Sequence, residues 1–306
     1  MKRRDDPSIA GALFIDKPAG LTSHDVVGKV RKALGMRRVG HAGTLDPMAT
    51  GVLVIGVGPT TRLLGIVGGH DKEYTATVRL GAATTTDDRE GEITTSADPQ
   101  LVAGIDDAVI SKAAAGFVGT IQQRPSAVSA VKVNGKRAYD RVRAGEEVEL
   151  AERTVTVRAF DVLEVRHSPE FVDVDVHVAC SAGTYIRALA RDIGQQLGVG
   201  GHLTQLRRTR SGGIRDCDCI AMEAVDRDRL VAPAAFARHE LPTVEIDEVT
   251  AVRARHGSSL ELNVPDAPVL ALVGPGDDLV CVAEVSAGSV RYLAVFPPVG
   301  GPVVGA

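Results

Sequence analysis

The segment from Phe171 to Val178 constrains the fold more than any other, because its residues alternate strictly in polarity. Successive side chains of a strand point to opposite faces of a sheet, so valines occupy one face and polar residues the other: Val172, Val174, Val176 and Val178 against Asp173, Asp175 and His177. This predicts a half-buried strand with His177 facing solvent. Strands are also predicted at 12–16, 52–57 and 72–80, with helices between them but no regular βαβ repeat. The pattern therefore predicts an α+β fold built on a mixed sheet.

Three helices are predicted among these strands. Thr22 or Ser23 can cap the first, which should end at Gly35, and residues 106–115 should form the second. Thr184 is predicted to cap the third, whose apolar stripe faces the core: Ile186, Leu189, Ala190, Ile193 and Leu197. At about 100° per residue, Tyr185 and Arg187 flank that stripe in the first turn. Both are placed to line a cleft; an amphipathic edge residue and a surface salt bridge are the ordinary alternatives.

Length and composition limit the class of protein. The 306 residues are enough for one large domain and a small one. No apolar run approaches the length of a membrane span, and the charged start leads to a proline rather than to the core of a signal peptide. We therefore expect a cytoplasmic protein without a membrane segment. The four cysteines are expected to be reduced, structural thiols, since no two pairs show zinc-finger spacing: Cys180, Cys217, Cys219 and Cys281.

The net charge of −4 hides three basic segments, at 29–41, 124–143 and 207–215. The first and third contain no acidic residue, and the second contains only Asp140. If the three segments converge in space, they form a phosphate-binding track on an otherwise acidic body. The alternative is three unrelated solvated faces.

The segment Gly40 to Pro47 holds one carboxylate in a turn. Pro47 disfavours helix for the residue before it, so Asp46 should be extended and its side chain free to enter a cleft. The glycines permit a tight turn, while His41 and Thr44 add polar groups beside the carboxylate. The alternative is an Asx turn, in which Asp46 caps its own backbone.

Four separated motifs occur in order: Gly11 to Gly20, Gly40 to Leu53, Asp71 to Tyr74, and Cys180 to Arg187. Together they resemble the motifs of the pseudouridine synthases, and of the TruB-type tRNA pseudouridine-55 synthases in particular. The resemblance covers about the first 230 residues and is much weaker beyond them. It implies a pseudouridine synthase fold, with a central mixed, mainly antiparallel sheet and flanking helices, and isomerisation of uridine 55 in the T loop of tRNA.

The resemblance also implies roles for individual residues. Asp46 is the catalytic carboxylate, Arg187 its buried cationic partner, and Tyr74 the ring that stacks on uracil and acts as acid or base near C5. His41 inserts where the flipped base has left, and further residues line the pocket or lie near it: Tyr185, Leu206, Lys17 and Lys72. The reaction breaks a C–N bond and rejoins uracil through C5, so no metal or organic cofactor is expected. Whether Asp46 forms an adduct at the sugar or removes a sugar proton to give a glycal stays open.

Two domains are expected from these observations. Residues 1–235 form the catalytic domain, with a basic, turn-rich, RNA-gripping insertion at about 122–150 that contains an Asn134-Gly135 hairpin turn. Residues 240–306 form a small β-rich, PUA-like RNA-binding domain. The expected partner is the T-arm stem-loop of tRNA; the protein should be a monomer that requires no protein partner.

Two other functions fit parts of this pattern. The chain could be an RNA-folding factor with an incidental pocket, and folding activity could also accompany catalysis. It could instead be a hydrolase that uses His41 and Asp46 together, but no serine or cysteine elbow accompanies them.

Overall fold

The computed structural model describes residues 5–6, 8–126, 132–133, 136–137 and 150–298. The chain divides into two compact units. Unit 1 comprises Met1–Leu45, Val52–Gly68 and Gly212–Ala306, and unit 2 comprises Asp46–Gly51 and Gly69–Ser211. None of the helices in the described ranges has the length and apolar character of a membrane span.

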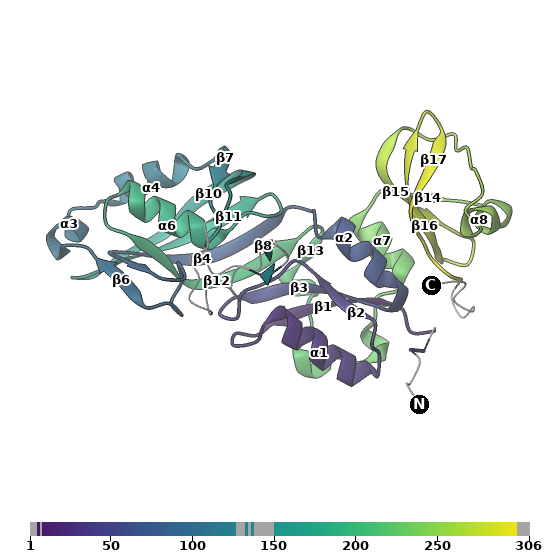
Figure 1. Ribbon diagram of the computed structural model, residues 1–306, viewed down its shortest axis with the longest axis horizontal. Helices are drawn as coiled ribbons and strands as arrows, with labels where there is room; N and C mark the ends of the chain where they lie inside the picture. The colour runs from purple at the N-terminus through teal and green to yellow at the C-terminus, as the bar shows by residue number, and fades with distance from the viewer. Residues whose placement is uncertain (1–4, 7, 127–131, 134–135, 138–149, 299–306) are drawn as a thin grey trace. The chain divides into compact units, whose positions relative to one another are not determined.

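Unit 2 is built on an antiparallel sheet with strand order β12-β4-β11-β10-β7 (Figure 1). The strands are β4 (Lys72–Leu80), β7 (Gly119–Gln123), β10 (Arg153–His167), β11 (Val172–Cys180) and β12 (Gly201–Ser211). The first two residues of β3 (Thr50–Val57) pair in parallel with β12. The sheet is therefore mixed and mainly antiparallel, as predicted.

The two faces of β11 confirm the alternation in the sequence. All four valines from Val172 to Val178 are buried, and the residues between them are only partly buried. On the polar face, Asp173 accepts two hydrogen bonds of 2.7 Å from Arg79. His177 is on this face as predicted, but its Nδ1 lies 3.2 Å from an Asp161 oxygen, so it makes a polar contact with β10 instead of simply facing solvent.

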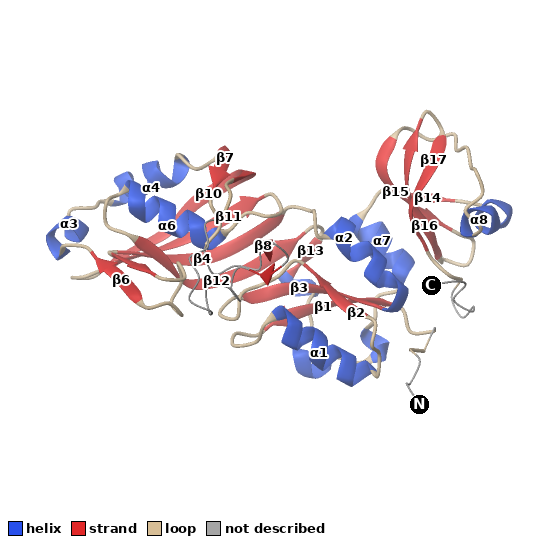
Figure 2. Ribbon diagram, viewed as in Figure 1, coloured by secondary structure: helices blue, strands red, loops and turns tan. Residues whose placement is uncertain are grey.

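Helices α4 (Asp107–Ala115) and α6 (Ile186–Gln196) pack against this sheet, α4 on β10 and α6 on β12 (Figure 2). The stripe predicted for α6 is buried at Ile186, Leu189, Ala190 and Ile193. The predicted cap is wrong: Tyr185 is the N-cap residue, and the Thr184 hydroxyl donates to the Ser181 carbonyl at 2.9 Å. Tyr185 therefore lies just before the helix, while Arg187 is inside it and buried.

A small hairpin follows β4. Strand β5 (Ala82–Thr84) pairs with β6 (Ile93–Ser96), and a polar loop connects the two strands. The short helix α3 (Pro99–Ala103) follows. Two further short strands, β8 (Lys132–Val133) and β9 (Lys136–Arg137), pair antiparallel on either side of the predicted Asn134-Gly135 turn, which itself lies outside the described residues.

Unit 1 begins with β1 (Gly11–Lys17), α1 (Ser23–Leu34) and β2 (Val39–Ala42). Strand β3 continues into this unit, where its neighbours are β1 and β2, and it is followed by a 3-10 turn (Gly58–Leu63) and α2 (Leu64–Val67). The predicted cap of α1 is confirmed, since Thr22 and Asp25 form a reciprocal capping box and Gly35 closes the helix with φ 66°. Strand β1 also exchanges two backbone hydrogen bonds with Val231, through Ala12.

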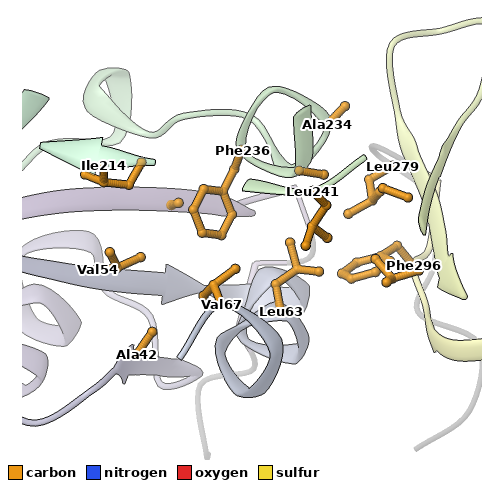
Figure 3. Packing of buried hydrophobic residues seen from close by; sticks show 14 of the residues in the cluster. Ala42, Val54, Leu63, Val67, Ile214, Ala234, Phe236, Leu241, Leu279 and Phe296 are labelled. Atoms are coloured by element: carbon orange, nitrogen blue, oxygen red, sulfur yellow. The ribbon is translucent and has the colours of Figure 1, made fainter. Parts of the chain in front are cut away.

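The last part of unit 1 is a small β-rich region, as predicted. It is preceded by the two-residue β13 (Ile214–Arg215), three 3-10 turns and α7 (Pro233–Glu240). Its elements are β14 (Thr243–Glu245), α8 (Glu248–Arg255), β15 (Ala267–Val273), β16 (Leu279–Ser286) and β17 (Ser289–Val295). The four strands lie side by side in chain order, and α8 packs beside β16. One apolar cluster joins this sheet to earlier elements: Phe236 and Leu241 pack with Leu63, Leu279 and Phe296 (Figure 3). Residues far apart in the sequence thus share one core.

Candidate active site

Asp46 lies in an irregular segment of unit 2, as its position before Pro47 predicts. Its backbone carbonyl accepts a hydrogen bond of 3.1 Å from the Ala49 amide, which forms the turn. The carboxylate is held by Arg187: Nε donates to Oδ2 at 3.0 Å and Nη2 donates to Oδ1 at 3.1 Å. This two-point contact fixes the plane of the carboxylate. The side chain of Asp46 remains 33% exposed, whereas that of Arg187 is 4% exposed, so the carboxylate is accessible and its partner is not.

Arg187 contacts a second acid that the sequence analysis missed. Its Nη1 donates to the Thr86 carbonyl at 2.8 Å and lies 3.4 Å from Asp88 Oδ2. The Asp88 side chain is only 4% exposed. One buried guanidinium therefore bridges Asp46, which faces the solvent, and Asp88, which does not.

The loop between β5 and β6 holds Asp88 in place. Its Oδ1 accepts hydrogen bonds from the Thr86 hydroxyl at 2.5 Å and from the Glu90 amide at 3.0 Å. Asp87 adopts a left-handed φ of 59°, and its carboxylate lies 3.2 Å from Arg191, one turn after Arg187 on α6. Adjacent aspartates thus contact two arginines of the same helix. Only the Asp-Asp pair in a threonine-rich segment hinted at this arrangement in the sequence.

Tyr74 is buried on β4, directly opposite Val178 of β11 and Arg208 of β12. Burial raises the pKa of its phenol; the charge of Arg208 and its hydrogen bond to the phenol oppose this rise, and the nearby Asp46 carboxylate adds to it. Arg208 is itself 1% exposed. At Gly51, with φ 96°, a Cβ atom would lie 2.2 Å from the Arg208 carbonyl oxygen, so only glycine lets β3 approach the strand there.

We expect that replacing Arg208 by methionine raises the pKa of Tyr74 further above 10.0, because the buried phenol loses the cation that favours its ionised form. Ultraviolet absorbance of tyrosinate measures this, with the Tyr74→Phe protein subtracted to isolate one phenol. Arg210→Met is the matched control, since Arg210 lies on the same strand and pairs with Glu73 at 2.8 Å. An unchanged Tyr74 titration in the Arg208 variant would contradict this coupling.

Tyr185 is fastened at the start of α6 by a residue from β7. The Gln123 amide donates to the Tyr185 carbonyl at 3.0 Å and accepts from the Tyr185 backbone N–H at 2.8 Å. Gln123 is fully buried, so both ends of its amide are used inside the protein. It takes the place of the missing side-chain cap. Leu206, the predicted apolar wall, is 7% exposed on β12, opposite Ala76.

Of the three remaining predicted site residues, one lies in unit 2 and two lie in unit 1. Lys72 begins β4 in unit 2, and its ammonium group donates to the His70 carbonyl at 2.6 Å. Lys17 and His41 belong to unit 1. The buried ammonium group of Lys17 donates to the Leu21 carbonyl at 2.7 Å, and His41 lies on β2 opposite Ile55. The structure therefore brings together Asp46, Tyr74 and Arg187, and the roles of all the predicted site residues stay predictions.

The third basic segment is not a simple surface track. Arg208 is buried and Arg210 is paired with an acid, so neither side chain resembles a solvated phosphate contact. Most of the second basic segment lies outside the described residues. Within the described ranges, no three His, Cys, Asp or Glu side chains gather as a possible metal site. Burial raises the pKa of the Cys180 thiol to about 11, as expected for a structural cysteine.

This arrangement combines an accessible carboxylate, a buried cation that fixes its orientation, and a buried phenol near both. Such a carboxylate can attack or deprotonate a bound sugar, while the phenol can exchange a proton with a base lying against it. Both oxygens of Asp46 accept from an arginine, which is unlike a histidine–aspartate pair in a hydrolase.

Comparison with known proteins supports this interpretation. The model of the TruB family pseudouridylate synthase N-terminal domain matches residues 31–186, and that of the tRNA pseudouridylate synthase B C-terminal domain matches residues 187–243. The tRNA pseudouridine synthase B of Leifsonia xyli subsp. xyli is 49% identical over 94% of this chain and 97% of its own length. The protein of that name from Cutibacterium acnes is 51% identical over 89% of this chain and 92% of its own length.

Solved structures show the same fold. A chain in the crystal structure of a Cbf5–Nop10–Gar1 complex is 27% identical, with a TM-score of 0.72 over 96% of this chain and 87% of that chain. A chain in the structure of an H/ACA RNP bound to a substrate RNA containing 2′-deoxyuridine is 25% identical, with a TM-score of 0.71 over 96% and 86% of the two chains. With two family models in sequence and relatives about half identical along most of its length, this chain belongs to the TruB family of pseudouridylate synthases.

Proposed function

We propose that this protein is a tRNA pseudouridine synthase, which converts uridine in tRNA to pseudouridine, and that its target is uridine 55 in the T loop. The observation that carries the proposal is the accessible carboxylate of Asp46, held at two points by the buried Arg187. The reaction needs an ionised carboxylate beside C1′ of the sugar. A buried guanidinium stabilises that ionised form when RNA excludes water from the site.

Each of the other residues has a part in this proposal. Tyr74 stacks on the uracil and takes part in the transfer of the C5 proton, and Tyr185 and Leu206 enclose the detached base while it rotates. Asp88 orients Arg187 from the side away from the substrate. The uridine must first leave its stack, at a cost of a few kcal/mol, and His41 fills the space that it leaves. Lys72 fixes the start of β4 through the His70 carbonyl, and Lys17 is assigned to the surroundings of the active site by the family resemblance alone.

The proposal extends to the domains and the partner. Residues 1–235 form the catalytic domain, the insertion at about 122–150 grips the T arm, and residues 240–306 form a PUA-like RNA-binding domain. We propose that the protein acts as a monomer, without a protein partner, on tRNA in the cytoplasm. Recognition then depends on the shape and backbone of the folded loop more than on the edges of its bases.

The experiment is release of tritium from C5-labelled uridine in a T-arm hairpin, with the position of the product mapped by mass spectrometry. We expect one labelled site to react, at position 55. A hairpin in which uridine 55 is replaced by cytidine, and the label is carried by the other uridines, should release none. Release from that second hairpin would contradict the assignment to position 55, and no release from either hairpin would contradict the proposed activity.

A further inference from the structure

Arg153, the first residue of β10, covers the ring of Tyr185. Its guanidinium carbon lies 5.4 Å from the centre of the ring, a distance at which a cation is attracted to an aromatic face. Arg153 also lies directly opposite Gln123 in the pairing of β10 with β7. Because opposite residues in a sheet point to the same face, Gln123 holds the backbone of Tyr185 while Arg153 covers its side chain.

The charge of Arg153 has no acidic partner in the described part of the chain. No carboxylate there lies within 4.0 Å of its guanidinium, and its Nε is buried without a hydrogen-bond partner. The other arginines that point from β10 are neutralised. Arg158 donates to Asp71 at 2.6 Å, and Arg166 donates to Asp175 at 2.5 Å. Arg153 is therefore a partly buried cation without an acidic partner among the residues described.

A partly buried charge without a counter-charge is costly, and a ligand anion can remove that cost. The aromatic ring fixes the plane of the guanidinium, which reduces the entropy lost when the group binds an anion with two parallel hydrogen bonds. The ring that Arg153 covers is close along the chain to the proposed catalytic pair: Tyr185 is two residues before Arg187, which holds the Asp46 carboxylate. RNA brings phosphates into this region if the proposed function is correct.

We propose that Arg153 binds a phosphate of the RNA substrate next to the reacting nucleotide, and that Tyr185 is the platform that holds its guanidinium for this contact. This inference rests on the proposed function, which supplies the RNA. It assigns Tyr185 a second task besides enclosing the base. It also explains why Gln123 fixes the backbone of Tyr185 so firmly: a platform must be rigid to orient the group that it carries.

The test is the salt dependence of binding of unmodified tRNA to the full chain. A phosphate contact contributes about 0.7–0.9 to the slope of log affinity against log salt concentration. Arg153→Gln should reduce the slope by that amount and weaken binding most at low salt, whereas Arg153→Lys should retain the slope. Arg158→Gln is the matched control on the same strand, and its slope should equal that of the wild type because its charge is already paired.

Turnover at saturating tRNA separates the contact from a purely structural effect. A phosphate contact made equally in the ground and transition states raises KM and leaves kcat nearly unchanged. A lower kcat with an unchanged salt slope would overturn the inference, since Arg153 would then only support Tyr185. Thermal unfolding confirms that each variant is folded. If the wild type binds tRNA and forms pseudouridine but Arg153→Gln keeps its slope, only this inference fails; if the wild type does neither, the proposed function fails.

Discussion

Replacing Asp46 by asparagine is expected to reduce pseudouridine formation by at least about 10³-fold, since the amide can neither attack nor deprotonate the sugar. The size and shape of the side chain are kept, and Arg187 can still donate to its oxygen. Binding of the T-arm hairpin should therefore remain. Tritium release measures the activity, and the same hairpin under single-turnover conditions shows whether any slow reaction persists.

The control for Asp46 is Asp173, which accepts two hydrogen bonds of 2.7 Å from Arg79 on the polar face of the sheet of unit 2. Asp173→Asn makes the same chemical change in the same kind of arginine–carboxylate pair, away from the proposed site. Its activity should equal that of the wild type. Turnover by Asp46→Asn at a rate near that of Asp173→Asn would exclude Asp46 as the catalytic carboxylate.

Replacing Arg187 by methionine should lower the free energy of unfolding by about 3–5 kcal/mol, because it leaves the buried Asp88 without its cation. The side chains of Arg187 and Asp88 are each 4% exposed, so water cannot take the place of the lost charge. We also expect activity to fall in the fraction that remains folded, since Asp46 loses both hydrogen bonds that orient it. Chemical denaturation measures the first effect and tritium release the second.

Arg79→Met is the matched control for stability. The Arg79–Asp173 pair has side-chain exposures of 35% and 24%, and exposed pairs contribute about 0–1 kcal/mol. A double variant tests the cause: Asp88→Asn should cost less stability in the Arg187→Met protein than in the wild type, because the unpaired charge is removed. Equal costs in the two backgrounds would mean that Asp88 and Arg187 do not interact appreciably.

The parts of the fold that the sequence predicts correctly are those in which local pattern and long-range packing agree. The valines of β11 alternate because one face of the strand is buried, and Thr22 caps α1 through Asp25, only three residues away. The start of α6 is different. Thr184 has the right chemistry for a cap, but Gln123, 62 residues away, binds the backbone of Tyr185 instead. A long-range amide replaces a local hydroxyl, and no periodicity reveals that.

The candidate site, too, contains residues that the sequence predicts and residues that it does not. Asp46 stands out because Pro47 follows it, and the resemblance adds Tyr74 and Arg187. The direction of Asp88 depends on the left-handed backbone at Asp87 and on the hydrogen bond from the Leu203 amide to the Asp87 carbonyl, at 3.0 Å. Arg208 looks like a surface charge in a basic run, and only the pairing of β12 with β4 shows that it is buried beside a phenol. The direction of Asp88 and the burial of Arg208 both depend on residues that are distant in the chain.

The pairing of β1 with Val231 has a consequence for the order of events during protein synthesis. More than 200 residues separate Ala12 from Val231, so at about 5–20 residues per second β1, whose neighbour β3 is made early, lacks this second partner for roughly 10–40 s. Unit 2 contains nothing beyond Ser211, so its sheet can form while the apolar cluster around Phe236 is still incomplete. The outer edge of β1 is thus covered late, and until then its unpaired backbone groups are exposed to other nascent chains.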